Sequence, residues 1–290
     1  MERAAEYVFA TARVATASLS HQFQALFGLS LAEKAGAPCA AGYVDVMAGQ
    51  VSSALDRECA VGRFDPFAYD TKLLLLCHSV LRERGFESDE LASFAGEVSA
   101  ALREMDVIPA RLAGVAHLLD AIGEDPFGAA GRIEPDMPRA DRSLLLRAET
   151  AEVREVCNRL AGASLFGARE LVIADRDDLL LTLPVLLLQK LREYDLILGS
   201  SLLRTLKYLG ASEQEDVDYA TRYLVCQQQG DGRFGYYARE LEGPSGRIAA
   251  QDLYLPVTVS VLWALAEASV PGLRVIERGR PVAVLGTETG

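Results

Sequence analysis

The sequence has few of the residues that most often reveal a reaction. It contains 3 histidines and 5 cysteines in 290 residues, and no two cysteines form a CxxC pair. Zinc needs three or four nitrogen, sulfur or oxygen ligands that converge on one point, and the chain offers few of them. We also find no nucleophile elbow, phosphate-binding loop or dinucleotide-binding unit. We therefore expect neither a metal nor another cofactor.

Positive charge is also scarce. The chain has 29 Lys and Arg against 41 Asp and Glu, which gives a formal net charge of -12. Nucleic acids and anionic membranes are bound by surfaces with an excess of Lys and Arg, so we expect neither as a partner. The odd number of widely spaced cysteines indicates reduced thiols, as in a cytoplasmic protein.

Long hydrophobic runs are missing as well. The strongest, Leu179–Leu188, is about ten residues long and contains Pro184, whereas a membrane span needs about twenty. The beginning of the chain carries Glu2 and Glu6 and is not typical of a signal peptide. We expect a soluble, cytoplasmic protein without a membrane span.

The chain is rich in apolar residues at helical spacing. Half of it is hydrophobic, which is enough for a sizeable core. We predict an all-α protein with a single domain over residues 1–290. A Pro- and Gly-rich loop over 125–142 divides it near the middle, and 273–290 form a short tail. The expected helices are 2–20, 39–59, 68–84, 88–106, 109–122, 143–162, 175–194, 196–209, 212–229 and 249–270.

Three local signals predict where helices begin and end. Gly28 is expected to stop a first helix that runs on from residue 20. Ser88 is a plausible N-cap for the helix that follows it. Ser212 and Glu215 have the spacing of a capping box at the start of another helix.

Two leucine-rich stretches resemble each other. Asp70 precedes one and Asp177 precedes the other, and each stretch ends in Leu-Arg-Glu. Two matching apolar helices fit a ring of helices whose inner members are buried on most sides. Two unrelated buried helices would give the same pattern.

The segment Tyr223–Tyr237, YLVCQQQGDGRFGYY, combines glutamines, a Gly-Asp-Gly turn and an aromatic residue. It resembles the glutamine–aspartate–glycine–aromatic repeat of terpenoid cyclases and protein prenyltransferases. That resemblance implies an α/α toroid of paired helices. The layout of the whole chain also resembles an uncharacterised bacterial family found largely in actinobacteria, from which no activity can be transferred.

The segment Asp175-Arg176-Asp177-Asp178 resembles the Asp-x-Asp-Asp signature of class II terpenoid cyclases. The resemblance implies that Asp177 is the acid that protonates an alkene or epoxide and that Asp175 and Asp178 tune it. Crowded carboxylates can keep one proton among them. The alternative is that these residues cap a helix and interact with its dipole.

Aromatic residues gather toward the C-terminal helices. They are Phe234, Tyr236, Tyr237, Tyr254 and Trp263. In terpenoid cyclases such residues line the cavity and stabilise carbocations with their π faces, so the resemblance implies a substrate-binding role. Ordinary core packing is the alternative.

Cys77, His78 and Cys226 are the residues that come nearest to a zinc set like that of prenyltransferases and lanthipeptide cyclases. The lanthipeptide Cys-His-Gly and Trp-Cys-x-Gly signatures do not occur. A buried thiol beside a hydrogen-bonded histidine is the better interpretation. We expect His21 and His117 to be structural too.

Two hypotheses about function follow. The first is an enzyme that acts on a hydrophobic small molecule in a toroid cavity, for example by proton-initiated cyclisation in natural-product biosynthesis. The second is a non-catalytic scaffold of the same fold that binds a ligand or a protein. A homodimer is left open.

Overall fold

The computed structural model describes residues 1–14, 17–127, 133, 142–168, 171, 173, 175–237, 250–270, 273 and 275. Every regular element within these residues is a helix, which confirms the all-α prediction. The α-helices are α1 (Glu2–Ala12), α2 (Leu19–Lys34), α3 (Ala40–Ala60), α4 (Thr71–Glu83), α5 (Asp89–Arg103), α6 (Ala113–Ala121), α7 (Arg142–Leu145), α8 (Thr150–Ala163), α9 (Arg176–Arg192), α10 (Leu196–Tyr208), α11 (Glu215–Cys226) and α13 (Ala250–Ser269). Two 3-10 turns, η1 (Pro66–Ala68) and η2 (Ala110–Leu112), precede α4 and α6.

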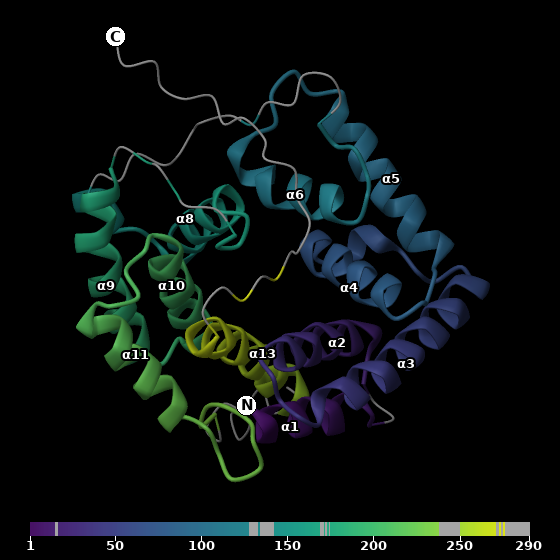
Figure 1. Cartoon of the computed structure of the whole chain (residues 1–290), viewed down its shortest axis with the longest axis horizontal. Helices are drawn as coiled ribbons and strands as arrows, with labels where there is room; N and C mark the ends of the chain where they lie inside the picture. Colours follow the sequence, from purple (N-terminus) through teal and green to yellow (C-terminus); the bar gives the residue numbers. More distant parts are fainter. Residues whose placement is uncertain are drawn as a thin grey trace, which may run out of the picture.

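Six of these helices form a closed cycle of contacts. Along the chain, α2 packs on α4, α4 on α6, α6 on α8, α8 on α10 and α10 on α13. The cycle closes because α13 also packs on α2. Viewed down the shortest axis of the molecule, these helices surround the centre (Figure 1).

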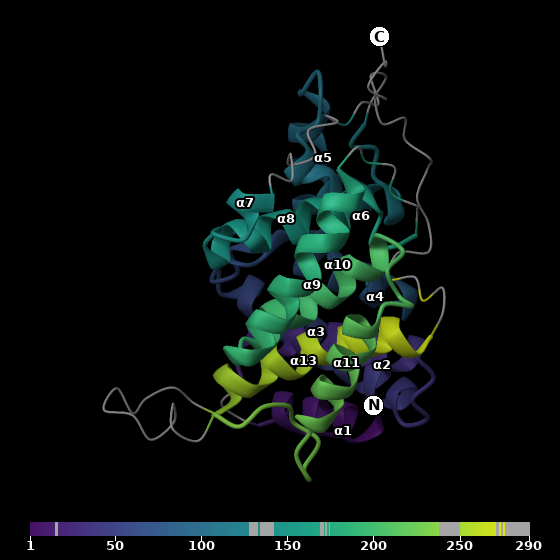
Figure 2. The ribbon, with the colours of Figure 1, turned by 90° about the vertical axis from the view of Figure 1, so that its left-hand side faces the viewer.

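The remaining long helices lie outside this cycle. Each contacts the inner helices beside it: α3 packs on α2 and α4, α5 on α4 and α6, α11 on α10 and α13, and α1 on α13 and α2. Helix α9 packs on α10 and carries the short α7. Inner and outer helices therefore alternate along most of the chain. Helices α1 and α13 lie toward one end of the molecule, and α5 and α6 toward the other (Figure 2).

Helix α2 is buried on most of its sides, as an inner helix must be. Gly28 lies inside α2 rather than at its end, so the prediction that it stops a helix is wrong. A β-carbon at this position would lie 2.9 Å from Cγ2 of Val259 in α13. The missing side chain lets the two helices approach closely. Imidazole Nε2 of His21 also lies 2.7 Å from the Asp252 carboxylate, a second link between α2 and α13.

A second close approach joins α6 to α8. A β-carbon on Gly162 would lie 2.7 Å from the backbone nitrogen of Gly114 and 3.3 Å from its Cα. Gly162 is thus needed for the contact, because its neighbour is backbone and cannot rotate away, whereas a β-carbon on Gly114 would lie at an ordinary contact distance of 3.5 Å from Gly162 Cα.

The ends of the helices agree with the sequence in some places only. The Ser88 hydroxyl accepts a hydrogen bond from the Leu91 amide at 3.3 Å, as predicted. The predicted first helix is instead two helices, because Ser18 starts α2 in a capping box with His21. The Ser212 capping box is absent, since α11 begins after Gln214.

The two similar leucine-rich stretches occupy different positions. The stretch after Asp70 forms the inner helix α4, whereas the one after Asp177 forms the outer helix α9 (Figure 1). Leu181 and Val185 of α9 are about half exposed, at 56% and 49%. The two leucine-rich stretches therefore resemble each other in sequence but occupy different positions, one inside the cycle of helices and one outside it.

The Pro- and Gly-rich loop lies mostly outside the described residues, as does the tail from 276 onward. Its Ile133 is buried and forms an isolated bridge with Ile108. Buried apolar residues from both halves of the chain form one core cluster. No described helix has the length and apolar character needed to cross a bilayer.

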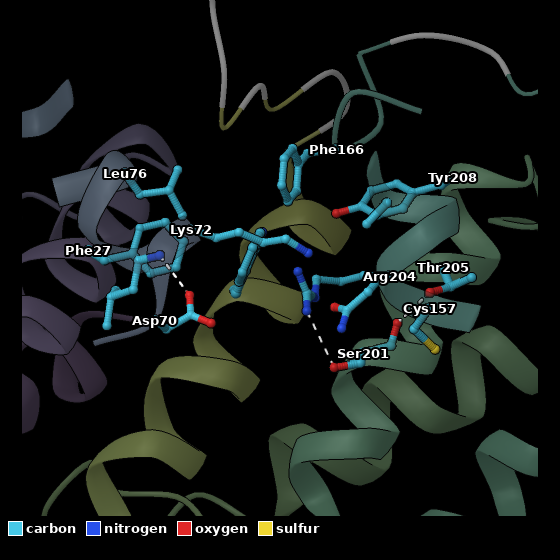
Figure 3. A pocket seen from close by; sticks show the side chains of 14 residues that line it. Phe27, Asp70, Lys72, Leu76, Cys157, Phe166, Ser201, Arg204, Thr205 and Tyr208 are labelled. Carbon is cyan, nitrogen blue, oxygen red and sulfur yellow. Dashed lines mark hydrogen bonds between the residues drawn. The ribbon is translucent and has the colours of Figure 1, made fainter. Parts of the chain in front are cut away.

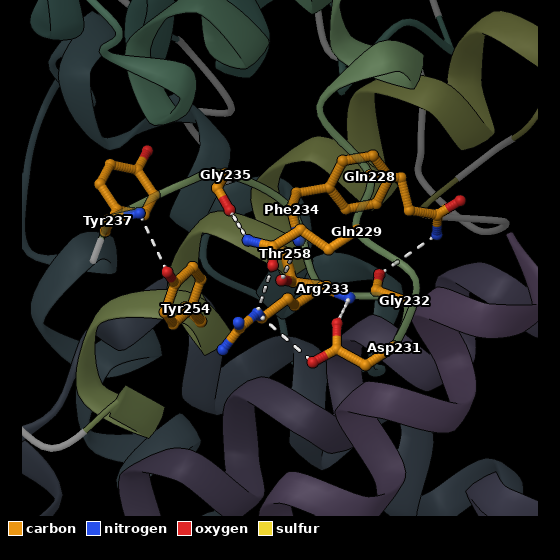
Figure 4. A network of polar contacts seen from close by, with 10 residues as sticks. All are labelled: Gln228, Gln229, Asp231, Gly232, Arg233, Phe234, Gly235, Tyr237, Tyr254 and Thr258. Carbon is orange, nitrogen blue, oxygen red and sulfur yellow. Dashed lines mark hydrogen bonds and ion pairs between the residues drawn. The ribbon is translucent and has the colours of Figure 1, made fainter.

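Residues 227–237, which we call the clasp, follow α11 and fold back on themselves (Figure 4). The backbone N–H of Gln229 donates to the backbone carbonyl of Arg233 at 2.8 Å, and the backbone N–H of Gly235 donates to the backbone carbonyl of Gln227 at 3.1 Å. Gln228 Nε2 donates to the Gly232 carbonyl at 3.2 Å. The main-chain groups of Gln227 and Gln229 and the side chain of Gln228 thus supply hydrogen-bond partners for the backbone of a tight turn.

The clasp also joins distant helices. The Phe234 amide donates to Oγ1 of Thr258 at 3.1 Å, and the Tyr237 amide donates to the Tyr254 hydroxyl at 2.9 Å; both acceptors lie on α13. The Tyr236 amide donates to the Tyr194 hydroxyl, between α9 and α10, at 2.8 Å. Gly232 lies against the carbonyl of Arg3 in α1. One short segment therefore ties the outer helices to the inner cycle.

Replacing Gly232 with alanine should lower the free energy of unfolding by about 1–3 kcal/mol, because a side chain at positive φ is strained. Gly232 has a φ of 97°, and its β-carbon would overlap the Arg3 carbonyl. Gly230 has open space around it, so Gly230→Ala should change the free energy by less than about 0.5 kcal/mol. Urea unfolding measures both, and equal losses in the two variants would contradict this role of Gly232.

Candidate ligand-binding site

A cavity of about 210 Å³ lies at the centre of the helical cycle. Its lining comes from five of the six inner helices, α2, α4, α8, α10 and α13, together with the turn after α8. Four aromatic and two cationic side chains are the most distinctive members (Figure 3). They are Phe27, Phe166, Tyr208, Trp263, Lys72 and Arg204.

Trp263 is the centre of the aromatic wall. Its ring meets Phe27 edge to face, with centroids 4.9 Å apart, and lies nearly parallel to Phe166 at 6.1 Å. The three rings come from α13, α2 and the turn after α8, so the closure of the cycle is what brings them together. Such a wall provides a flat apolar surface for a ligand.

Arg204 lies over the Trp263 ring, with its guanidinium carbon 3.6 Å from the ring centroid. The contact is a cation–π interaction, which holds the guanidinium in one orientation. Nη2 donates a long hydrogen bond of 3.4 Å to the Ser201 hydroxyl. Nε is buried and has no hydrogen-bond partner. Nε is therefore out of reach of the cavity, so any donation from Arg204 to a ligand there comes from its Nη groups.

Lys72 approaches from the opposite side, from the first turn of α4 (Figure 3). Burial lowers the pKa of its ammonium group, since a charged amine loses hydration inside the protein. Within the part of the chain that the structure describes, no carboxylate forms an ion pair with it. Asp70, also at the cavity, instead accepts from the Leu73 amide at 2.8 Å and caps α4.

Cys157 is the only cysteine of the cavity lining. Burial raises the pKa of its thiol to about 11, so the reactive thiolate is scarce at neutral pH. The raised pKa of the Cys157 thiol therefore argues against its acting as a nucleophile here.

A buried carboxyl group lies at the edge of the cavity. Oε1 of Glu267 accepts from the Tyr208 hydroxyl at 2.7 Å and from Nε1 of Trp263 at 2.6 Å. Burial raises the pKa of Glu267, and it also raises that of Tyr208 well above its ordinary value. The pKa of nearby Lys207 is lowered to about 8 by burial. These shifts are typical of functional sites, although structural networks produce them too.

Glu267 also faces a second, larger cavity of about 950 Å³, between the ends of α10 and α13 and the start of α11. Phe166 and Tyr208 line both cavities. The two side chains therefore form the wall that separates them.

The predicted acid residues lie elsewhere. Asp177 and Asp178 are exposed in the first turn of the outer helix α9, and Asp175 is its half-buried N-cap residue. None of the three lines a described cavity. Their position favours interaction with the helix dipole, and catalysis by Asp177 stays a prediction from the resemblance.

Of the five aromatic residues predicted to bind substrate, Trp263 lines the central cavity. Phe234 and Tyr237 are buried side chains of the clasp itself, Tyr254 is buried next to it on α13, and Tyr236 is 60% exposed. The structure thus brings four of them together around the clasp, at a distance from the cavity in the fold. Their contacts there are those of core packing and backbone hydrogen bonds.

The cysteine and histidine side chains considered for zinc do not converge. The Cys77 thiol donates to the Phe23 carbonyl at 3.2 Å, and burial lowers the pKa of His78 to about 4. Cys226 is exposed on the outer helix α11. The described residues contain no group of three His, Cys, Asp or Glu side chains placed to hold a metal ion. The five cysteines form no disulfide.

Sequence reasoning missed Lys72, Arg204 and Glu267. Each carries an ionisable group in an otherwise apolar helical stretch, as in LILGSSLLRTLKYLG around Arg204. A charge on the buried face of a helix is a signal for a functional site. This signal is present in the sequence and depends on which face of its helix each residue occupies.

The raised pKa of Glu267 predicts a pH dependence of stability. The native protein keeps this proton at pH values where the unfolded chain has lost it, so the stabilisation is complete below the ordinary pKa of 4.5 and is lost as pH rises through the raised value. Gln at this position keeps an oxygen for Tyr208 and Trp263 but cannot titrate. The free energy of unfolding of Glu267→Gln should therefore fall less steeply above pH 4.5.

Urea unfolding at a series of pH values measures this slope. The control is Glu97→Gln, which removes an exposed carboxylate of α5 and should retain the wild-type slope. Parallel curves for the wild type and Glu267→Gln would show that the carboxyl group titrates normally.

No protein-family model, no curated protein and no solved structure matches this chain. The interpretation of the site rests on its own geometry.

Proposed function

We propose that this chain is an α/α toroid of the terpenoid cyclase and prenyltransferase type, which binds a small molecule with a hydrophobic body in its central cavity. The fold proposal is supported by the closed cycle of inner helices, by the alternation of inner and outer helices, and by the resemblance of the clasp segment. The resemblance to an actinobacterial family supports a bacterial source, and the resemblance to terpenoid cyclases supports a natural-product context.

One observation carries the functional proposal. The central cavity combines a wall of aromatic rings with ionisable groups that are partly buried. Burying charge costs folding free energy, so a core selected only for stability would have apolar residues in these places. Concave apolar sites with a few directed polar groups are typical of small-molecule binding.

Catalysis is the stronger version of this proposal. A carboxyl group with a raised pKa keeps its proton to a higher pH than an ordinary carboxyl group, as a general acid must. Glu267 is such a group, and its two hydrogen-bond donors, Tyr208 and Trp263, line the cavity. It is a better-placed candidate acid than Asp177, which carries only the sequence resemblance. A binding scaffold without turnover is the alternative.

Filling the cavity should abolish binding. Ala161 lies in the cavity lining on α8, so Ala161→Phe would occupy the space without deleting a core contact. We expect decan-1-ol to bind the wild type and to bind this variant at least about tenfold more weakly. Isothermal titration calorimetry measures both affinities.

The matched control is Ala151→Phe, which adds the same ring to an exposed position of the same helix. It should bind decan-1-ol as the wild type does. Equal affinities for the wild type and Ala161→Phe, with both proteins folded by circular dichroism, would show that the cavity is not the binding site.

A separate test distinguishes an enzyme from a scaffold. Native mass spectrometry of freshly purified protein identifies a retained hydrophobic molecule, which is then incubated with excess protein. Conversion to a product of altered mass or altered chromatographic retention identifies an enzyme, and an unchanged molecule identifies a scaffold. Asp177→Asn should abolish conversion if Asp177 is the acid; if Glu267 has that role, only Glu267→Gln should do so.

A further inference from the structure

Lys72 and Arg204 place two cationic groups in the central cavity of an acidic protein. Their side chains extend toward one another from α4 and α10 (Figure 3). The chain as a whole carries a formal charge of -12. Like charges repel more strongly where they are partly removed from water, as these two are, so a negative charge between them would be favourable.

The carboxylates around the pair are engaged elsewhere. Asp70 caps α4 through the Leu73 amide, and Glu155 pairs with Arg159 at 2.9 Å. Glu267 holds the Tyr208 and Trp263 donors and has a raised pKa. None of them forms an ion pair with either cation among the described residues. At longer range Asp70 and Glu155 attract the Lys72 ammonium and Glu267 attracts the Arg204 guanidinium, so the protein compensates the pair only in part.

Two further observations show that the cations are held at a cost. Nε of Arg204 is buried and makes no hydrogen bond, and an unsatisfied buried donor is unfavourable. Lys72 lies in the first turn of α4, where the positive end of the helix dipole disfavours a cation. A bound anion would offset the unfavourable position of the Lys72 ammonium and balance the charge of Arg204, whereas Nε of Arg204 lies out of its reach.

We propose that Lys72 and Arg204 bind the anionic group, a carboxylate or a phosphate, of an amphiphilic ligand whose apolar part lies against the aromatic wall. The Trp263 ring fixes the plane of the Arg204 guanidinium, so its edge can donate to an oxyanion in a defined direction. The compact ammonium of Lys72 adds a point charge from the other side. This inference rests on the proposed function and specifies the class of ligand.

Three probes with the same ten-carbon body test it: decan-1-ol, decanoate and decyl phosphate. We expect decanoate or decyl phosphate to bind at least about tenfold more tightly than decan-1-ol, since hydrogen bonds to charged groups are the stronger ones. The preferred anion identifies the headgroup. Lys72→Met should reduce the affinity for that anion to about the affinity for decan-1-ol, and Lys72→Arg should retain most of it.

Two controls accompany these variants. Arg222→Met removes a positive charge that is exposed on α11 and should leave all three affinities unchanged. Inorganic phosphate alone should bind more weakly than decyl phosphate, because it lacks the apolar part. Calorimetry gives the affinities, and urea unfolding confirms that each variant is folded.

The outcomes separate the inference from the proposal beneath it. If decan-1-ol and both anions bind equally and Lys72→Met changes nothing, the anion site is wrong while the hydrophobic cavity stands. If inorganic phosphate binds as tightly as decyl phosphate, the amphiphilic ligand is wrong. If no ten-carbon probe binds the wild type, the proposed function fails together with the inference.

Discussion

The packing of α13 between α2 and α10 is the contact on which the rest of the structure depends. It closes the cycle of inner helices, and it is possible because Gly28 removes the side chain that would meet Val259. The same helix carries Trp263 and Glu267 and receives the clasp through Thr258 and Tyr254. Helix α13 thus closes the cycle of inner helices and carries both the aromatic ring of the cavity wall and the Glu267 carboxyl group. A shift of α13 would alter all three.

Under the proposed function, the ionisable residues of the cavity serve ligand binding and lower the free energy of unfolding. Lys72, Arg204 and Glu267 are each partly buried; burial disfavours the charged states of Lys72 and Glu267, and Arg204 has a buried Nε without a hydrogen-bond partner. The aromatic rings beside them contribute apolar burial that offsets this cost. Under the proposed function, stability and ligand recognition depend on the same few positions, and Trp263 serves both.

The sequence predicts local structure well where a signal acts locally. Helical periodicity and the Ser88 cap were sufficient for the all-α class and most helices. Gly28 was misassigned because its role is set by Val259, about 230 residues away, and no local pattern reveals such a neighbour. For the same reason the sequence predicts one substrate-binding group of five aromatic residues near the C-terminus, although of these five Trp263 alone lines the central cavity. The ionisable residues there become visible once the inner faces of helices are known.

The closure of the ring also constrains how the protein is made. Helix α2 leaves the ribosome early, with most of its surface apolar, whereas its partner α13 begins at residue 250. At about 5–20 residues per second, the interval between them is roughly 10–50 seconds. During that time the nascent α2 has no native cover on one side. Translation speed and chaperone supply, rather than the final stability, would then govern how much of the protein folds correctly.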